Sequence, residues 1–323
     1  MTWIVTGGAG FIGAHVVHLL RERHDVVVFD DLSTGRVDRL PSDVPVVKGS
    51  ITNRDDLDRL FALYPAQGVI HLAACKFVDE SVRDPVLYRR VNVHGVELVL
   101  AAMRRANVDR LLFASSAAVY GDTGDRPVRE LTRLRPINPY GRTKRDAERL
   151  VAHAGRGLRS LVLRKFNVVG AGRHPQAVDA APGTLLPAIF QAIAGGPDLV
   201  VRGRDYLTPD GSPVRDYIHV ADVAEAYARG VDYLSRTWPA SRRHRVVNLG
   251  SGTGTSVLDL VDIVSRVTGK AVPYGYGPPR AGDPAAVVAS VGRARRMRWQ
   301  SRHSVDQAVE AAWESWQTYV AGC

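Results

Sequence analysis

A glycine-rich turn near the N-terminus constrains the fold of this chain more than any other feature. The motif Gly8-x-Gly10-x-x-Gly13 directly follows the apolar run Trp3-Ile4-Val5 and opens an amphipathic stretch, Phe11 to Arg23. Glycine suits such a turn because the turn is tight, because the backbone approaches a pyrophosphate closely, and because the helix packs against the strand. A helix N-terminus also offers free N–H groups to phosphate. The context therefore predicts the start of a dinucleotide-binding unit.

An acidic residue after the next apolar run favours one dinucleotide over another. The run Val26-Val27-Val28-Phe29 is followed by Asp30, seventeen positions after Gly13. A carboxylate there accepts hydrogen bonds from ribose hydroxyls and repels a 2′-phosphate. No arginine immediately follows Asp30, so NAD is favoured over NADP as the cofactor. A flavin site and a purely structural glycine turn are the alternatives.

Short apolar runs alternate with longer amphipathic stretches along the first half of the chain. Further strands are expected at 69–72, 110–114 and 160–163, and helices at 57–63, 92–106 and 140–154. Strands that alternate with helices of this length form crossover units in a parallel sheet covered on both faces. The expected fold class is α/β, a doubly wound parallel (Rossmann) sheet with a smaller C-terminal substrate-binding lobe.

The pattern loosens after Asn167, where segments rich in glycine and proline predict loops at 170–183 and 203–213. A strand is expected at 246–250, and helices at 257–268 and 305–320. We therefore expect an NAD-binding domain over residues 1–167, with 214–250 partly returning to it, and a mainly substrate-binding lobe over 168–323.

Composition excludes several classes of protein. The net charge is +10, but the basic residues are scattered and are not interleaved with aromatic residues, so no nucleic-acid partner is expected. The two cysteines, Cys75 and Cys323, have no metal-ligand spacing, so no metal is expected. No apolar stretch is long enough to span a membrane, and the first residues lack the features of a signal peptide. The expected location is the cytoplasm.

A tyrosine and a lysine at the head of a predicted helix indicate acid–base chemistry. Tyr140 and Lys144 lie four residues apart and so share one helix face. Tyrosine is a poor base at neutral pH, but a nearby ammonium favours the phenolate. Ser116 follows a predicted parallel strand one crossover upstream, at the sheet edge where ligands of such folds bind. A surface tyrosine and lysine would be the structural alternative, and this position argues against it.

Four stretches together carry a resemblance over nearly the whole chain. They are Thr6 to Gly13, Val69 to Ala74, Asn138 to Lys144, and Thr208 to Val220. The chain resembles the extended short-chain dehydrogenase/reductase family, and within it the UDP-glucose (UDP-galactose) 4-epimerases. The resemblance implies that Tyr140 is the base on the sugar 4-OH, that Ser116 is its hydrogen-bonding partner, and that Lys144 binds the nicotinamide ribose and depresses the tyrosine pKa.

The resemblance also implies the residues that line the two binding sites. Asn167, Arg215 and Arg280 would hold the diphosphate, and Asp283 the nucleotide ribose. The expected cofactor-binding residues are Gly7, Gly10, Phe11, Ile12, Gly13, Asp30, Asp31, Ser33, Thr34, Gly35, Ser50, Ile51, Leu72, Ala73, Ala74, Lys76, Asn92, Tyr140, Lys144 and Phe166. The expected substrate-binding residues are Lys76, Ser116, Tyr140, Asn167, Leu185, Val201, Arg202, Arg215, Tyr217, Arg280, Asp283 and Val287.

The residues after Ser116 separate two reactions within this family. Sugar dehydratases place acidic residues there to protonate the leaving hydroxyl, whereas this chain has Ala117 and Ala118. The expected activity is therefore NAD-dependent 4-epimerisation of a nucleoside-diphosphate sugar through a transient 4-keto intermediate, with UDP-glucose and UDP-galactose as the first expected pair. Alternatives are a dTDP-hexose or UDP-uronic acid epimerase, a 4-keto-sugar reductase, and a non-catalytic NAD-binding protein. A homodimer is the family-level expectation.

Several positions depart from the family pattern and bear on the substrate. Ser50 stands in place of an aspartate near the adenine, and Thr184 and Arg202 replace residues expected near the nucleotide. Val287 falls where these enzymes carry either a tyrosine or a small residue, so a space for an N-acetyl group is one interpretation and a core position is the other. Lys165 offers a competing idea, the pairing of its ammonium with a uronic-acid carboxylate.

Overall fold

The computed structural model describes residues 2–124, 126–155, 157–172, 178–179, 181, 183–236, 243–280 and 282–321. The chain divides into two compact units. The first unit comprises Met1–Val119, Asn138–Arg164 and Ala224–Val247, and the second comprises Tyr120–Ile137, Lys165–Val223 and Asn248–Cys323. The assignment of Tyr120–Ile137 to the second unit was not part of the sequence prediction.

The first unit is built on a seven-stranded sheet whose strands follow the order β11-β6-β5-β4-β1-β2-β3. The pairs β3–β2, β2–β1, β1–β4 and β4–β5 are parallel. Chain order reverses between β1 and β4, which is the switch point at which such sheets bind ligands. The predicted doubly wound fold is confirmed. The strands are β1 (Thr2–Thr6), β2 (Asp25–Asp30), β3 (Val46–Lys48), β4 (Ala66–His71), β5 (Arg110–Ser116), β6 (Arg159–Lys165) and β11 (His244–Leu249).

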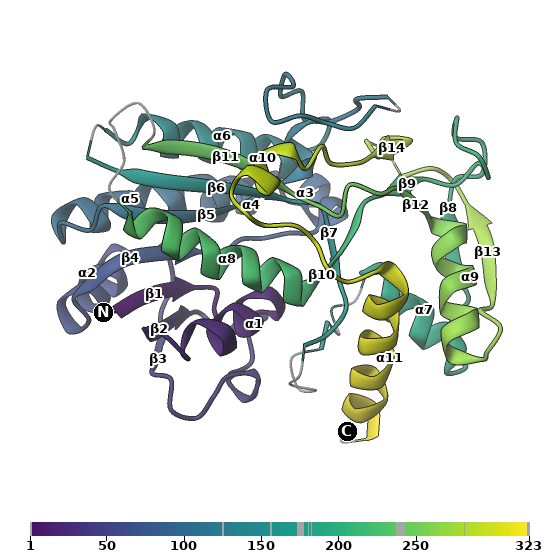
Figure 1. Ribbon diagram of the computed structural model, residues 1–323, viewed down its shortest axis with the longest axis horizontal. Helices are drawn as coiled ribbons and strands as arrows, with labels where there is room; N and C mark the ends of the chain where they lie inside the picture. Colours follow the sequence, from purple (N-terminus) through teal and green to yellow (C-terminus); the bar gives the residue numbers. More distant parts are fainter. Residues whose placement is uncertain are drawn as a thin grey trace. The chain divides into compact units, whose positions relative to one another are not determined.

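Five helices cover the two faces of this sheet. Helices α2 (Arg54–Leu63), α5 (Gly95–Arg105) and α6 (Pro139–His153) pack on one face, and α1 (Phe11–Leu20) and α8 (Val220–Ser235) lie on the other (Figure 1). Both faces are apolar because the strands are buried on both sides, as expected for a parallel sheet. At Gly230 of α8, an added Cβ would lie 2.4 Å from a methyl carbon of Leu112, so the glycine lets this helix lie close to the strands.

The path between β4 and α5 carries two short helices and an irregular turn. Helices α3 (Val78–Arg83) and α4 (Pro85–Arg89) are followed by a π-helical turn, Arg90–His94, that leads into α5. The sequence predicted one helix from 92 to 106, so the first residues of that helix are wound differently from the prediction. A π-turn holds one extra residue per turn and is frequent at functional sites.

The second unit has its own apolar core, formed mainly by helices. Its helices are α7 (Leu185–Ile193), α9 (Val257–Thr268), α10 (Gly292–Arg296) and α11 (Val305–Ala321). Three small sheets accompany them: β7 (Asn167–Val169) with β10 (Tyr217–His219), β9 (Val214–Arg215) with β12 (Thr255–Ser256) and β14 (Ala286–Val287), and β8 (Leu199–Arg202) with β13 (Tyr274–Gly277). Helix α9 starts at a capping box formed by Ser256 and Asp259, and it spans the predicted residues.

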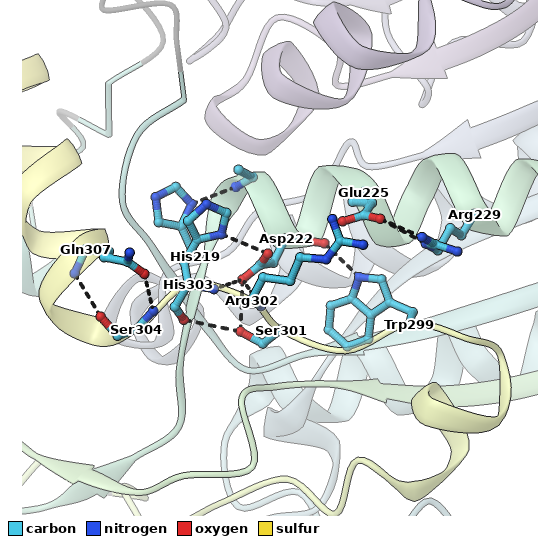
Figure 2. A network of polar contacts seen from close by, with 11 residues as sticks. His219, Asp222, Glu225, Arg229, Trp299, Ser301, Arg302, His303, Ser304 and Gln307 are labelled. Carbon is cyan, nitrogen blue, oxygen red and sulfur yellow. Dashed lines mark hydrogen bonds and ion pairs between the residues drawn. The ribbon is translucent and has the colours of Figure 1, made fainter.

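The buried carboxylate of Asp222, at the start of α8, forms hydrogen bonds with the segment before α11 (Figure 2). Asp222 is 1% exposed and accepts hydrogen bonds from the Ser301 hydroxyl and from the backbone N–H groups of Arg302 and His303. Its other oxygen lies 2.9 Å from Nδ1 of His303, whose ring stacks on that of His219 at 4.3 Å. A buried carboxylate with this many donors fixes the backbone that surrounds it.

Two further observations concern membrane-spanning helices and metal sites. Among the described residues, no helix combines the length and apolarity needed to cross a membrane. No group of three or more His, Cys, Asp or Glu residues in the described part of the chain is arranged to hold a metal ion. Cys75 is a free thiol, and Cys323 lies outside the described residues.

Candidate active site

The glycine turn after β1 has the close contacts that a dinucleotide cradle requires. Gly7 has a φ of 70°, and a Cβ added to it would lie 2.5 Å from the backbone N of Ala73. A Cβ on Gly13 would lie 2.2 Å from the carbonyl oxygen of Gly7. Helix α1 begins at Phe11 with no acidic residue in its first turn, so its N-terminal N–H groups and dipole remain favourable to phosphate.

Asp30 ends β2 and lies beneath the same turn. Its carboxylate accepts hydrogen bonds from the backbone N–H groups of Ala9 and Leu32, at 3.0 and 2.9 Å. Burial raises the pKa of Asp30, and these two hydrogen bonds oppose that rise. A Cβ added to Gly35 would lie 2.6 Å from Oδ1 of Asp30, so the loop after β2 closes on the carboxylate. These residues fit the adenosine end of NAD.

The other residues predicted to bind the cofactor fall at the carboxyl ends of the same strands. The backbone N–H groups of Leu72 and Ala73 both donate to the carbonyl of Thr6, which joins the loop after β4 to the end of β1. Asp31 accepts from the backbone and hydroxyl of Ser33. Ser50 follows β3, and its backbone N–H donates to Asp56. Thr34, Ile51, Ala74 and Lys76 lie in the loops between these positions, and Phe166 is a buried residue of the second unit.

Asn92 uses its side chain to connect the loop after β4 with α6. Its amide oxygen accepts from the backbone N of Cys75, and its NH₂ group donates to the carbonyl of Cys75 and to the hydroxyl of Thr143. The Thr143 hydroxyl in turn donates to the carbonyl of Tyr140. Both amide hydrogens are used within the protein, so the π-turn places Asn92 as a support for α6.

The three residues predicted to be catalytic meet at the carboxyl end of β5. Tyr140 lies in the first turn of α6, which starts where the Asn138 side chain accepts from the backbone N–H of Gly141. The Ser116 hydroxyl forms a hydrogen bond with the Tyr140 phenol. The ring of Tyr88 packs edge-on against that of Tyr140, with ring centroids 6.3 Å apart.

The structure differs from the prediction on the proton affinity of Tyr140. Burial raises the pKa of Tyr140, and the hydrogen bond from Ser116 opposes this rise. No depression of the Tyr140 pKa by Lys144 is seen, and the Lys144 ammonium donates to the carbonyl of Ala114 at 3.0 Å. Burial lowers the pKa of Lys144 to about 8, while neighbouring Cys75 and Glu148 act in the opposite direction.

Two alanines follow the active-site serine, as the sequence shows. Ala117 and Ala118 form a short 3₁₀ turn, and the backbone N–H of Ala118 donates to the Ser116 hydroxyl at 3.2 Å. Neither side chain has a proton to give to a leaving hydroxyl group. The turn serves to hold Ser116 at the end of β5.

The second unit brings together two of the residues predicted to bind the nucleotide. Arg215 and Asp283 form an ion pair, and both side chains are largely buried. The adjacent Asp216 is fully buried and accepts from the backbone N–H groups of Ser251, Gly252 and Ala289, which holds the Arg215 backbone firmly. Val287 is in register with Arg215 across β14 and β9, so the two side chains lie on one face.

The remaining substrate-binding candidates have different surroundings. Leu185, Val201 and Tyr217 belong to the apolar core of the second unit. Asn167 and Arg202 are exposed, and Thr184 and Arg280 are partly exposed. The backbone carbonyl of Arg280 accepts a hydrogen bond from the backbone N–H of Asp283 at 3.1 Å, which places Arg280 beside the Arg215–Asp283 pair.

Tyr206 is a residue that the sequence did not single out. Its hydroxyl is buried and has no hydrogen-bond partner among the described residues. Burial raises the pKa of Tyr206, Asp283 adds to the rise, and Arg215 and Arg280 oppose it, so the phenol shares its surroundings with these three charged groups. A buried hydroxyl without a partner is costly unless a ligand supplies one. Sequence reasoning had no signal for it beyond its position in a turn-rich segment.

Comparison with known proteins agrees with this arrangement. Residues 3–250 match the family model described as the NAD dependent epimerase/dehydratase family. The chain belongs to this family. A UDP-glucose 4-epimerase of Streptomyces lividans is 40% identical over 318 residues, which cover 97% of this chain and 95% of that protein. A UDP-glucose 4-epimerase of Azospirillum brasilense is 39% identical over 322 residues, 97% of this chain and 91% of that protein.

Solved structures of the same epimerase/dehydratase family resemble the fold closely. The UDP-glucose-4-epimerase of Stenotrophomonas maltophila, with bound NAD and formylated UDP-arabinopyranose, matches with a TM-score of 0.93 at 36% identity, with 100% of both chains covered. The UDP-glucose 4-epimerase of Bifidobacterium longum, in complex with NAD⁺ and UDP, matches with a TM-score of 0.91 at 32% identity, covering 99% of this chain and 98% of that one. The predicted family and the predicted cofactor, NAD, are confirmed.

Proposed function

We propose that this chain is an NAD-dependent 4-epimerase that interconverts UDP-glucose and UDP-galactose. The observation that carries the proposal is the placement of Tyr140, hydrogen-bonded to Ser116 and one helical turn from Lys144, at the carboxyl end of β5. That edge of the sheet also carries the glycine turn and Asp30. The 4-epimerase names of the full-length relatives support the same activity.

The residues of the first unit fit NAD as the resident cofactor. The glycines of the turn leave room that a Cβ would fill, and Asp30 is placed to accept from ribose hydroxyls and to disfavour a 2′-phosphate. When bound, NAD supplies the hydride acceptor and donor for C4 of the sugar. Lys76, Asn92, Lys144 and Phe166 are our proposed residues on the nicotinamide side.

The protein's own groups supply orientation and proton transfer. Tyr140 takes the proton of the sugar 4-OH and returns it, and Ser116 holds the same oxygen in line. Lys144, one helical turn from Tyr140, holds the nicotinamide ribose. Arg215 and Arg280 hold the diphosphate, so that the 4-keto sugar turns over without leaving. Ala117 and Ala118 offer no acid for the loss of a hydroxyl, which favours epimerisation over dehydration.

The test is an assay of purified protein with UDP- and dTDP-linked glucose, N-acetylglucosamine and glucuronate, with products separated by chromatography. The expected result is the galactose epimer from UDP-glucose, with no net oxidation or reduction of NAD. Net consumption of a reduced cofactor would support the rival 4-keto-sugar reductase. No reaction with any of these sugars would contradict the proposal.

We also propose that the protein acts in the cytoplasm as a homodimer that associates through helices flanking the sheet. Light scattering on the purified protein would give twice the mass of one chain, and a monomer at micromolar concentration would contradict the dimer.

A further inference from the structure

A buried polar network lies two helical turns beyond the catalytic tyrosine. Tyr140, Lys144 and Glu148 follow one another at four-residue spacing and so lie on one face of α6. Glu148 is 6% exposed, and the Arg164 side chain opposite it on β6 is 4% exposed. The network is absent from the predicted site, because it joins residues from three separate elements.

The hydrogen bonds that join the three side chains of this network are directional. Nε of Arg164 donates to Oε1 of Glu148 at 2.8 Å, and Nη2 donates to Oε2 at 2.6 Å. The hydroxyl of Ser115, at the end of β5, donates to Oε1 as well. A two-pronged guanidinium–carboxylate pair fixes orientation as well as distance.

Stability alone is a weak reason for burying such a pair. The desolvation of two charges offsets most of their attraction, and apolar residues of similar volume often stabilise a core equally well. A forked pair specifies one rotation of the helix about its axis, which apolar packing does not do as strictly. Helix α6 is the element that carries the reactive phenol.

The neighbouring contacts place this constraint beside the chemistry. Ser115 precedes Ser116, and the Lys144 ammonium donates to the carbonyl of Ala114 on the same strand. Three consecutive residues of β5 thus contact three successive turns of one face of α6. A small rotation of α6 would move Tyr140 and Lys144 together relative to Ser116.

We propose that Glu148 is a positioning residue which, through Arg164 and Ser115, sets the rotation of α6 and thereby the placement of Tyr140 and Lys144 against β5. This role deepens the proposed 4-epimerase function and rests on it. Glu148 touches neither substrate nor cofactor in this scheme.

The test replaces the whole network by apolar residues, in the triple variant Ser115→Ala/Glu148→Leu/Arg164→Met. The carboxylate, the guanidinium and the hydroxyl are removed together, so none of the three is left facing an apolar replacement, and the thermal midpoint and the NAD content are expected to stay near those of the wild type. The kcat for UDP-glucose is expected to fall at least about tenfold, because a displacement of about 1 Å is costly in a preorganised site. KM is expected to stay within about twofold, since the second unit is unchanged. A stable, NAD-loaded triple variant with wild-type kcat would overturn the proposal.

A matched control lies at the opposite end of β6. Arg159 also forks onto a carboxylate, that of Asp109, with Nη2 donating at 2.8 and 2.7 Å. The variant Asp109→Leu/Arg159→Met removes a forked pair that is partly exposed, with the Asp109 side chain 48% exposed, far along the strand from Ser116, and its kcat is expected to be unchanged. An equal loss of kcat in this control would show a general effect on the sheet and would refute the positioning role.

A second variant and a second measurement guard against misfolding and against failure of the proposed reaction. Arg164→Lys keeps the charge but loses the fork, and it is expected to lower kcat with NAD still bound; unchanged kcat in this variant would refute the role. The pKa of Tyr140 can also be measured independently of catalysis, by ultraviolet titration of each protein with its own Tyr140→Phe counterpart subtracted as the reference. This pKa is expected to be higher in the triple variant than in the wild type. An unchanged titration midpoint there would contradict the proposal even if UDP-glucose proved not to be the substrate.

Discussion

Arg215 and Asp283 form an ion pair in which guanidinium Nη2 lies 2.5 Å from carboxylate Oδ1. The two residues were predicted to bind different parts of one substrate, the diphosphate and the ribose. The two charges neutralise each other, so a bound diphosphate would take over part of the arginine and leave the carboxylate to a ribose hydroxyl.

This exchange predicts a large effect of Arg215→Met on nucleotide binding. Loss of the guanidinium leaves Asp283 as a partly buried negative charge facing the diphosphate, so the Kd for UDP is expected to rise by about ten- to a hundredfold. Isothermal titration with UDP measures this directly. The control is Arg266→Met, which removes an exposed arginine that pairs with Asp306. Equal UDP affinity in Arg215→Met and the wild type would exclude Arg215 from the nucleotide site.

The phenol of Tyr140 is predicted to be essential for turnover. Tyr140→Phe keeps the ring and its edge-on packing with Tyr88 but removes the group that accepts the 4-OH proton. The kcat is expected to fall at least about a hundredfold with little change in UDP-sugar affinity, as for a lost general base. Tyr274→Phe on β13, where the side chain is exposed, is the control. Near-normal kcat in Tyr140→Phe would remove Tyr140 from the mechanism.

Burial of the Lys144 ammonium is predicted to lower the free energy of unfolding. Its pKa falls from 10.5 in the unfolded chain to about 8 in the folded protein. Between these values the unfolded state binds more protons, so stability rises with pH in this window, and the cost is largest below pH 8. Such a shift corresponds to roughly 3 kcal/mol.

Lys144→Met is therefore expected to unfold at higher denaturant concentration than the wild type at pH 7, and this difference is expected to shrink as the pH approaches 10. Activity should be lost at every pH. Denaturation curves at several pH values measure the effect, and a variant that is less stable at pH 7 would contradict it.

NAD is predicted to stay with the protein through purification, because the hydride returns in every cycle and release serves no purpose. Denatured protein is expected to release about one NAD(H) per chain. Asp30→Asn should lower this content, since the amide cannot accept from the ribose and from both Ala9 and Leu32. Asp25→Asn, at the exposed start of β2, is the matched control. Protein that arrives empty and requires added NAD would argue against tight retention.

The side chain of Val287 is predicted to set the range of sugars. Valine leaves space beside the sugar C2 that a tyrosine ring would fill, so UDP-N-acetylglucosamine is expected to be epimerised as well as UDP-glucose. Val287→Tyr should remove the N-acetyl activity selectively, as judged by kcat/KM for both sugars. The competing hypothesis is that the Lys165 ammonium pairs with the carboxylate of a uronic acid. It predicts that the wild type prefers the glucuronate substrate and that Lys165→Met abolishes this preference. Wild-type protein inactive on the N-acetyl sugar would refute the pocket interpretation.

Local sequence was sufficient for the parts of the fold that have long periodic patterns. The strand–turn–helix unit at Gly8 to Gly13 and the helix that carries Tyr140 and Lys144 both follow from the spacing of their residues. Helix α7 was missed because Pro187 stands inside an apolar run, and β13 because the run Tyr274 to Gly277 contains two glycines that read as a turn. Strands of two or three residues, such as β9 and β14, are too short to show a period.

The site was harder to predict where it depends on contacts between distant residues. Nothing near Glu148 in the sequence indicates Arg164 or Ser115 as its partners, because helix and strand meet only after folding. The π-turn at Arg90–His94 likewise has no sequence period of its own, so the hydrogen bonds of the Asn92 amide to Cys75 and Thr143 could not be predicted. The missing partner of the Tyr206 hydroxyl also becomes visible only in three dimensions.

The chain passes between its two units five times. This path limits the gene fusions with relatives that would exchange one unit and leave the other intact. Edge strand β11 and most of α8 belong to the first unit although they follow residue 223. A hybrid gene joined to a relative at a single crossover near residue 167 would therefore import a foreign sheet strand and a foreign covering helix together with the new second unit. A clean exchange of the second unit needs three separate segments, one of which begins at Tyr120. Substrate preference in such a chain is thus expected to diversify by substitutions in place, at positions such as Val287 and Arg202, rather than by the exchange of whole gene fragments.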